Sequence, residues 1–280
     1  SIKIRGVGTT GNNTGLDSSV GVFIDGVYQS RPGVALGDLM DLERLEVLRG
    51  PQGTLFGRNT SAGALNITTR RPSLDEAEGF ANATYGNLDF FNIQAGVGVP
   101  VVQDVAAVRF SGSYRKRDGY LKSTTGADSN NRDRYMLRGQ FYAEPSADVS
   151  IRLLADYSKV DENCCDAVVI RETELAPFFA ANGLTNSGVA ADAVGFAALD
   201  DLRTNSQRFI NLSKQWGLSG ELKWDLGGAE MTYIGSYRDF SSESTQESDF
   251  VSLNVFTAGR NGANSLPGQP KNGDDIKTMT

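Results

Sequence analysis

The densest set of chemically active side chains in this chain is a short run of alternating charges. Glu43, Arg44, Glu46 and Arg49 are interleaved with apolar residues along a predicted strand. Carboxylates and guanidinium groups arranged in this way form ion pairs across an interface. Bond-breaking chemistry is not indicated, because the chain has no histidine and no nucleophile motif. The sequence therefore predicts no catalytic residue, no metal site and no cofactor.

The two cysteines, Cys164 and Cys165, are adjacent in the sequence. Within this chain they can bond only each other. Such a bridge would not join distant segments, and a bridge between neighbouring residues is strained. We expect a local clip or a free pair in an exposed loop, and a redox-active pair is the alternative.

Short elements must position the charged run. The predicted strands and the one predicted helical stretch of this first region are Ile2–Arg5, Gly21–Ile24, Arg44–Arg49, Ala64–Thr69 and, as helix, Leu36–Leu42. Gly50 and Pro51 predict a tight turn after the third strand. A polar segment with a proline follows, which is typical of a boundary. We divide the chain into a first domain at 1–72, a linker at 73–79 and a second domain at 80–280.

The second domain is built from segments of about ten residues that alternate between apolar and polar side chains. The predicted strands are 80–85, 91–99, 106–114, 135–144, 149–158, 216–225 and 230–238. In the last five, one face carries no charge, although 22% of the whole chain is charged. Such alternation fits both a soluble sandwich and a membrane barrel.

Two features favour the membrane barrel. Trp216 and Trp224 lie near the two ends of one apolar face, as in the aromatic girdles of barrels. The connections alternate between tight turns, near 100–104, 145–148 and 226–228, and long loops. Barrels of the outer membrane have short turns on one side and long loops on the other.

Two other classes are disfavoured by composition. No apolar run reaches the roughly 18 residues of a membrane helix. A net charge of -7 argues against nucleic-acid binding.

Several ordered motifs resemble the TonB-dependent outer-membrane receptors. They are Ile4-Arg5-Gly6, Asp25-Gly26-Val27, the block 43–51, Phe56-Gly57, the block 64–69, and the turn YGNLD at 85–89. The likeness covers 1–72 closely and the start of the barrel more loosely. It implies an α+β plug domain with a small mixed sheet, inside an antiparallel transmembrane β-barrel. Such barrels have about 22 strands, of which this chain has about seven.

The resemblance also implies a function. Receptors of this kind take up a scarce ligand actively across the outer membrane of Gram-negative bacteria, and a ferric siderophore is the first expectation. Carbohydrate, cobalamin or aromatic compounds are alternatives. The implied partners are TonB, through an N-terminal box, and the lipid and lipopolysaccharide of the membrane. Neither that box nor a signal peptide is visible, so we expect an incomplete receptor.

The resemblance assigns site residues in two groups. Loops that rise to the outer mouth contact the ligand, and the residues expected there are Arg5, Thr10, Asn12, Tyr28, Gln29 and Arg31. Arginine suits anionic oxygens, and tyrosine offers a stacking face. The second group serves plug structure and gating, and comprises Glu43, Arg44, Glu46, Arg49, Gly50 and Pro51. Its charges are expected to pair either with inward-facing barrel residues (Arg109, Arg138, Arg152 and Asp156) or locally within the plug.

Three other classes compete with this interpretation. A structural or adhesive outer-membrane barrel would lack the block at 44–69. A barrel-borne enzyme would need catalytic groups that the sequence does not indicate. A non-specific porin would conduct ions steadily, whereas a plugged receptor stays closed.

Overall fold

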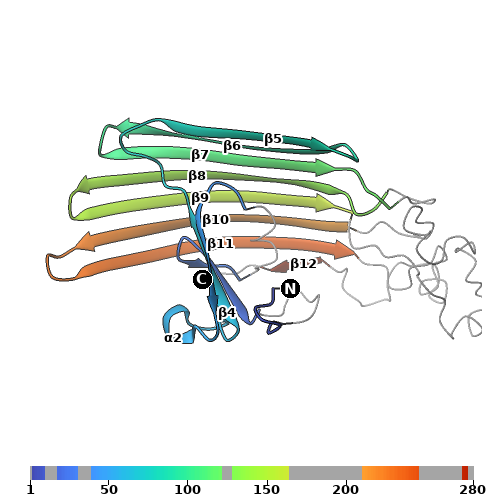
Figure 1. Ribbon diagram of the computed structural model, residues 1–280, viewed down its shortest axis with the longest axis horizontal. Coiled ribbons are helices and arrows are strands. Elements are labelled where there is room, and N and C mark those ends of the chain that lie inside the picture. Colours follow the sequence, from blue (N-terminus) through green and yellow to red (C-terminus); the bar gives the residue numbers. More distant parts are fainter. Residues whose placement is uncertain are drawn as a thin grey trace, which may run out of the picture.

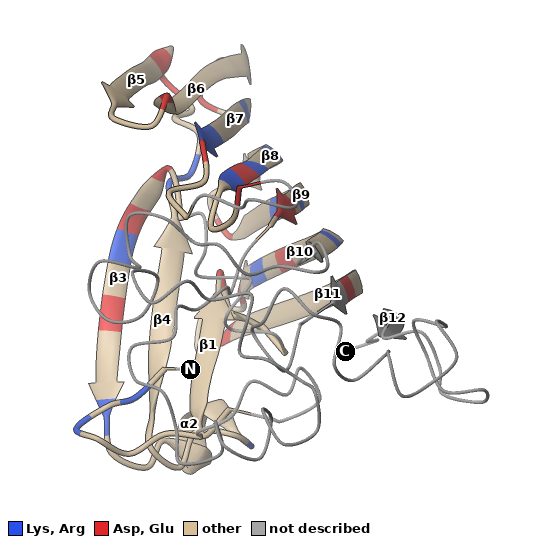
Figure 2. Ribbon diagram, turned by 90° about the vertical axis from the view of Figure 1, so that its right-hand side faces the viewer, with Lys and Arg blue, Asp and Glu red and all other residues tan. Residues whose placement is uncertain are grey.

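The computed structural model describes residues 2–9, 18–30, 39–121, 128–163, 210–245 and 273–276. These residues form two sheets, one of four strands and one of eight (Figure 1). The larger sheet, here called the wall, curves past the smaller one, and the strands of the small sheet run away from its inner face (Figure 2). The arrangement places one end of the small sheet against the wall.

The small sheet has the strand order β2-β1-β4-β3. Its elements are β1 (Val20–Ile24), β2 (Val27–Tyr28), β3 (Leu42–Arg49), β4 (Gly63–Thr69) and the short helix α2 (Gly53–Phe56). β1 and β4 are parallel, whereas the β1–β2 and β3–β4 pairs are antiparallel. The predicted small mixed sheet is therefore confirmed.

Burial explains why β1 and β4 lie at the centre of this sheet. The side chains of Val20, Val22 and Ile67 are almost completely inaccessible to solvent. β1 reads VGVFI, and a continuous apolar run of this kind is typical of a strand covered on both faces. The outer strand β3 instead alternates between charged and apolar residues and is largely exposed.

The wall is a meander in which each strand pairs antiparallel with the next. Its strands are β5 (Glu78–Gly86), β6 (Phe90–Val102), β7 (Ala106–Arg117), β8 (Arg132–Ser146), β9 (Val149–Glu162), β10 (Ile210–Asp225), β11 (Glu230–Thr245) and β12 (Gly273–Ile276). The tight turns predicted between β6 and β7, β8 and β9, and β10 and β11 are confirmed, and they lie at one end of the wall (Figure 1).

The two faces of the wall differ as the alternation predicted. Apolar side chains on the outer face are exposed, with Phe110 at 61% and Leu218 at 53% of their full accessibility. On the inner face, Arg109, Arg138 and Arg152 are buried. An exposed apolar face and a buried charged face are the reverse of a soluble sheet and fit a barrel wall in lipid. No helix among the described residues has the length and apolar character to cross a membrane.

The wall strands extend further than predicted. β8 begins at Arg132 rather than 135, β10 begins at Ile210 rather than 216, and β11 ends at Thr245 rather than 238. β12 was not predicted. The apolar alternation marks the part of a strand in hydrocarbon, about 9–11 residues. Beyond it, both faces are polar and the sequence pattern no longer distinguishes strand from loop.

Two predictions in the first domain were wrong. Residues 2–5 form no strand, and Ile4 instead bridges to Val7 around a turn in which Arg5 has φ 52° and Gly6 φ 80°. Of the predicted helix Leu36–Leu42, residues 36–38 lie outside the described residues. The described remainder is not helical, because Asp41 has φ 53° and Leu42 already belongs to β3. The tertiary contact of Asp41 described below outweighs local helix propensity.

The segment between the two sheets leads into β5, which begins at Glu78, two residues before the predicted strand at 80–85. The segment is tied to the nearest tight turn, where the Gln103 side chain donates to the Asp75 carbonyl at 2.9 Å and the Asp104 amide donates to the Leu74 carbonyl at 2.9 Å. A hydrogen bond from the Ser73 hydroxyl lowers the pKa of the Asp75 carboxyl below its usual value.

Candidate functional site

The β1–β2 turn carries a carboxylate into the inner face of the wall. Ile24 pairs with Val27, so Asp25 and Gly26 alone form the turn, with φ of 50° and 78°. Asp-Gly is the sequence that such a left-handed two-residue turn prefers. A Cβ built on Gly26 would lie only 2.6 Å from Cδ1 of Ile234, so the turn sits directly against β11.

Asp25 forms a buried ion pair with Arg152 of β9. Arg152 Nη1 lies 3.0 Å from Asp25 Oδ1, and the two side chains are 2% and 4% exposed. The Thr69 amide and hydroxyl donate to the same carboxylate at 2.9 and 2.7 Å. Arg152 Nη2 also donates to Gln140 Oε1 at 2.7 Å and to the Thr69 carbonyl at 3.1 Å. A buried pair with its remaining hydrogen bonds satisfied is stable, but removal of one partner leaves a costly isolated charge.

A second buried pair joins the start of β3 to β7. Arg109 holds both oxygens of Asp41 through Nε and Nη2, at 2.7 and 2.8 Å, and its Nη1 lies 3.0 Å from Glu78 Oε1. The Arg109 and Asp41 side chains are 2% and 1% exposed. The bidentate geometry fixes both the distance and the orientation of the start of β3 relative to the wall.

Weaker contacts complete the interface. Arg71 lies 3.4 Å from the Glu221 carboxylate and stacks over the Tyr142 ring at 5.5 Å. The Gln140 amide donates to the Arg70 carbonyl at 3.0 Å. Arg138 is buried and makes a long contact, 3.5 Å, with the Met40 carbonyl. Most of these wall contacts therefore gather at one end of the small sheet, at the ends of β1 and β4 and the start of β3.

Glycines allow two wall arginines to reach across a strand. Arg109 passes over Gly98 to Glu78, and the three residues are register partners on β7, β6 and β5. Arg238 passes in the same way over Gly217 to Asp156, with nitrogen–oxygen distances of 2.8 and 3.1 Å. A Cβ on Gly98 or Gly217 would lie 3.0 or 2.9 Å from the arginine Nη1. Each glycine, here called a saddle glycine, thus leaves room above its backbone for the arginine to reach the carboxylate on the strand beyond.

The saddle geometry predicts the effect of Gly217→Val. The valine side chain would displace Arg238 from Asp156, and we expect the wall to lose about 1–3 kcal/mol of stability. Thermal unfolding of the protein, followed by β-sheet circular dichroism, measures this. Gly235→Val is the matched control, since a Cβ there meets only the Tyr233 ring at 3.5 Å. Equal stability of the two variants would contradict the saddle role.

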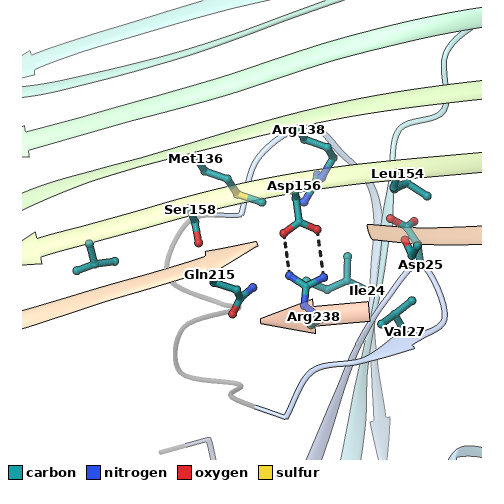
Figure 3. Close-up of a pocket in the computed structure, with 12 residues that line it drawn as sticks. Ile24, Asp25, Val27, Met136, Arg138, Leu154, Asp156, Ser158, Gln215 and Arg238 are labelled. Atoms are coloured by element: carbon teal, nitrogen blue, oxygen red, sulfur yellow. Dashed lines mark hydrogen bonds and ion pairs between the residues drawn. The ribbon is translucent and has the colours of Figure 1, made fainter. Parts of the chain in front are cut away.

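A small polar cavity lies between the β1–β2 turn and the wall (Figure 3). Arg138, Asp156 and Arg238 line it together with Asp25. Its volume is about 30 Å³, enough for two or three water molecules. A cavity of this size cannot hold a larger molecule, so it is a narrow gap between the two sheets. Within the described parts of the chain, no cluster of three or more acidic or sulfur side chains offers a metal site.

The predicted gating residues do not lie at the interface between the small sheet and the wall. Of the two arrangements expected for the charges of β3, Arg44 and Glu46 adopt the local one, 3.4 Å apart, and Glu46 also accepts from Asn66 at 2.8 Å. Because β3 runs away from the wall, its later residues cannot reach the wall arginines (Figure 2). Glu43 and Arg49 are exposed along the same strand.

The predicted turn at Gly50 and Pro51 lies at the end of the small sheet opposite the wall contacts. Gly50 has φ 80°, and α2 follows within three residues. The turn therefore sets backbone geometry far from the interface, and the wall arginines pair instead with Asp25 and Asp41 at the near end. Sequence analysis missed these two aspartates, although three arginines on the inner face required carboxylate partners from some other element.

The structure describes three of the six residues predicted to contact the ligand. Arg5 is exposed on its turn, and Thr10, Asn12 and Arg31 lie outside the described residues, as do Cys164 and Cys165. Tyr28 packs against Phe23 at a centroid distance of 5.5 Å, and its hydroxyl accepts from Asn59 at 3.0 Å. Gln29 is buried and donates to the Val27 carbonyl at 3.1 Å. Both side chains thus have structural partners within the small sheet.

Residues 1–64 match the family described as TonB-dependent Receptor Plug Domain. Among curated proteins, the chain is 37% identical over 71 residues to the pesticin receptor of Yersinia pestis. The aligned residues make up 25% of this chain and 10% of that protein. It is 31% identical over 112 residues to the catecholate siderophore receptor Fiu of Escherichia coli K12, which is 37% of this chain and 14% of Fiu.

Solved receptor structures have the same fold. The ferric yersiniabactin uptake receptor FyuA of Yersinia pestis aligns with a TM-score of 0.66 at 16% identity, over 83% of this chain and 33% of FyuA. The open form of the ferric-catecholate import receptor Fiu of Escherichia coli K12 aligns with a TM-score of 0.58 at 16% identity, over 80% and 32%. The chain therefore spans about a third of the length of the receptors that it matches in structure.

Proposed function

We propose that this chain, which carries the plug domain and part of the barrel wall of a TonB-dependent receptor of the Gram-negative outer membrane, serves the gated uptake of a scarce ligand. The small sheet is the plug and the wall is part of the barrel. We place the plug at 1–72, the linker at 73–79 and the barrel from residue 80 onward. Proteins of this family are transporters rather than enzymes.

The plug–wall interface is the observation that carries the proposal. A barrel of about 22 strands has a lumen that must be blocked, or the membrane would leak. The block must also move when ligand is imported. Charged pairs such as Asp25–Arg152 and Asp41–Arg109 favour a contact that is specific when closed and can be rehydrated when open.

The ligand that we propose is a ferric siderophore. Support comes from relatives that are named as receptors for catecholate siderophores and for ferric yersiniabactin. Carbohydrate, cobalamin and aromatic compounds are the other ligands open to this architecture. The proposed contact set on the plug is Arg5, Thr10, Asn12, Tyr28, Gln29 and Arg31. TonB is the proposed energising partner.

Iron uptake by the full-length receptor tests this function. We expect its expression in a strain that lacks endogenous siderophore receptors to restore uptake of radioactive iron from at least one ferric siderophore. The uptake should vanish in an otherwise identical strain without TonB. Uptake of cobalamin or a sugar, with no ferric siderophore imported, would contradict the proposed ligand, and TonB-independent uptake would contradict the gating.

A further inference from the structure

Arg138 is buried at the interface between plug and wall and forms no ion pair with a described residue. It is 6% exposed, and it lines the small cavity between the β1–β2 turn and the wall (Figure 3). Its hydrogen bonding within the described part of the chain is limited to the Met40 carbonyl at 3.5 Å. Arg109, Arg152 and Arg238 each hold a carboxylate at 3.0 Å or closer. A buried charge without a partner is costly, so the place of Arg138 needs a physical reason.

The carboxylates at the cavity are already bound to other arginines. Arg138 and Asp156 are register partners on β8 and β9. Arg238 nevertheless holds both oxygens of Asp156 from β11, at 3.1 and 2.8 Å. On the plug side, Asp25 is held by Arg152 at 3.0 Å. These described groups comprise three guanidinium groups and two carboxylates, which leaves one positive charge in excess beside the cavity.

The charged groups next to the cavity do not remove this excess. Asp41 is held by Arg109 at 2.7 Å. Arg109 also contacts Glu78 at 3.0 Å, and Glu78 lies 3.8 Å from Arg70. Two arginines and two aspartate or glutamate side chains therefore balance one another there, and neither carboxylate is in excess to compensate for Arg138.

Two more side chains that can donate hydrogen bonds line the same cavity (Figure 3). Ser158 on β9 and Gln215 on β10 are register partners, and Gln215 is 9% exposed. Within the residues that the structure describes, neither side chain forms a hydrogen bond. Buried polar groups in native proteins are almost always hydrogen-bonded. A guanidinium, a hydroxyl and an amide around one small space are the donors that a small anion requires.

We propose that this cavity binds one small monovalent anion, chloride, between the Arg138 guanidinium and the side chains of Ser158 and Gln215. The excess positive charge favours an anion over a cation or a neutral molecule. The volume of about 30 Å³ admits a monatomic ion and excludes phosphate and organic acids. The site goes beyond the proposed uptake function, because it requires only that the plug is docked.

Binding of the anion is linked to docking of the plug. Ile24, Asp25 and Val27 of the β1–β2 turn form the plug side of the cavity, and wall residues form the rest. The site is therefore complete only while the turn lies against the wall. An ion that binds the docked state alone stabilises that state in proportion to its concentration. Chloride should accordingly hold the plug closed.

Proteolysis of the intact purified protein tests the proposal. Chloride is exchanged for gluconate at constant ionic strength, and the rate of cleavage within the plug is measured. We expect the rate to fall about tenfold between no chloride and about 300 mM chloride, as for a site with a Kd of about 30 mM. Gluconate is too large for the cavity, so it serves as the inert anion.

Two variants separate the site from general salt effects. Arg138→Met removes the charge and the donors without leaving an unpaired cation, and it should abolish the dependence on chloride. Lys116→Met is the matched control. It removes a cation from β7 that is exposed and that lies on the face opposite Arg109, and it should keep the full dependence.

Crystals of the wild-type protein grown in bromide give a second measurement that does not depend on a variant. We expect an anomalous peak beside Arg138, between Ser158 and Gln215. Cleavage at equal rates in chloride and gluconate, or a dependence that Arg138→Met retains, would overturn the proposal. So would bromide crystals without a peak in the cavity. None of these results would affect the proposed uptake function, which the iron-uptake experiment tests separately.

Discussion

Replacement of Asp25 by alanine is expected to detach one corner of the plug from the barrel. Arg152 would remain as a buried cation without its carboxylate, and the Thr69 amide and hydroxyl would lose their acceptor. Removal of one partner of a buried ion pair costs about 3–5 kcal/mol. We expect the plug of the full-length receptor to be cut by added protease at denaturant concentrations that leave the wild-type plug protected.

Asp25→Asn removes the negative charge but keeps the size of the side chain. Its amide retains an oxygen for Thr69 but cannot form an ion pair with Arg152. It should show most of the effect. Glu46→Ala is the control, since it removes a carboxylate from an exposed pair with Arg44 on the same sheet, and exposed pairs contribute about 0–1 kcal/mol. Protease protection that is equal in all three variants would show that docking does not depend on the buried pair.

The double variant Asp25→Ala with Asp41→Ala is expected to have the largest effect on the closed state. The two aspartates hold the β1–β2 turn and the start of β3 to different wall strands, through Arg152 and Arg109. Arg109 keeps Glu78 as a partner, so the second substitution should cost less than the first. Together they remove both buried pairs between plug and wall.

Planar-bilayer recordings measure this outcome. The wild-type receptor should stay closed, each single variant should open rarely, and the double variant should conduct steadily because the lumen is wide once the plug leaves. Arg44→Ala with Glu46→Ala removes two charges from the same sheet and should stay closed. A double aspartate variant as silent as wild type would mean that other contacts, such as Arg71 with Glu221, hold the plug in place.

The separation between buried pairs and exposed pairs has a mechanistic consequence. The near end of the plug is bound to the wall by two buried ion pairs, while β3 and α2 at the far end make their contacts within the plug. A pulling force applied to the plug therefore meets its main resistance at Asp25 and Asp41. These residues, rather than the charges of β3, are where we expect substitutions to change the ease of opening.

The sequence alone determined the two-faced strands, the placement of the tight turns, and the identity of the plug. These properties are local, because a strand exposes successive side chains on opposite faces and lipid accepts only an uncharged one. Arg109, Arg138 and Arg152 could accordingly be placed on the inner face from their spacing. The parts of each strand beyond the membrane carried no such constraint, and their ends were mispredicted.

Only the tertiary structure decided which charges meet. Asp25 and Arg152 are 127 positions apart, and Asp41 and Arg109 are 68 apart. No local periodicity encodes such a pairing, since it depends on how the small sheet is oriented against the wall. The charged run on β3 drew attention because it was dense, yet that strand points away from the barrel. The aspartates that anchor the plug lie singly, in a turn and at a strand start, where only the docked arrangement of the two sheets brings them to their partners.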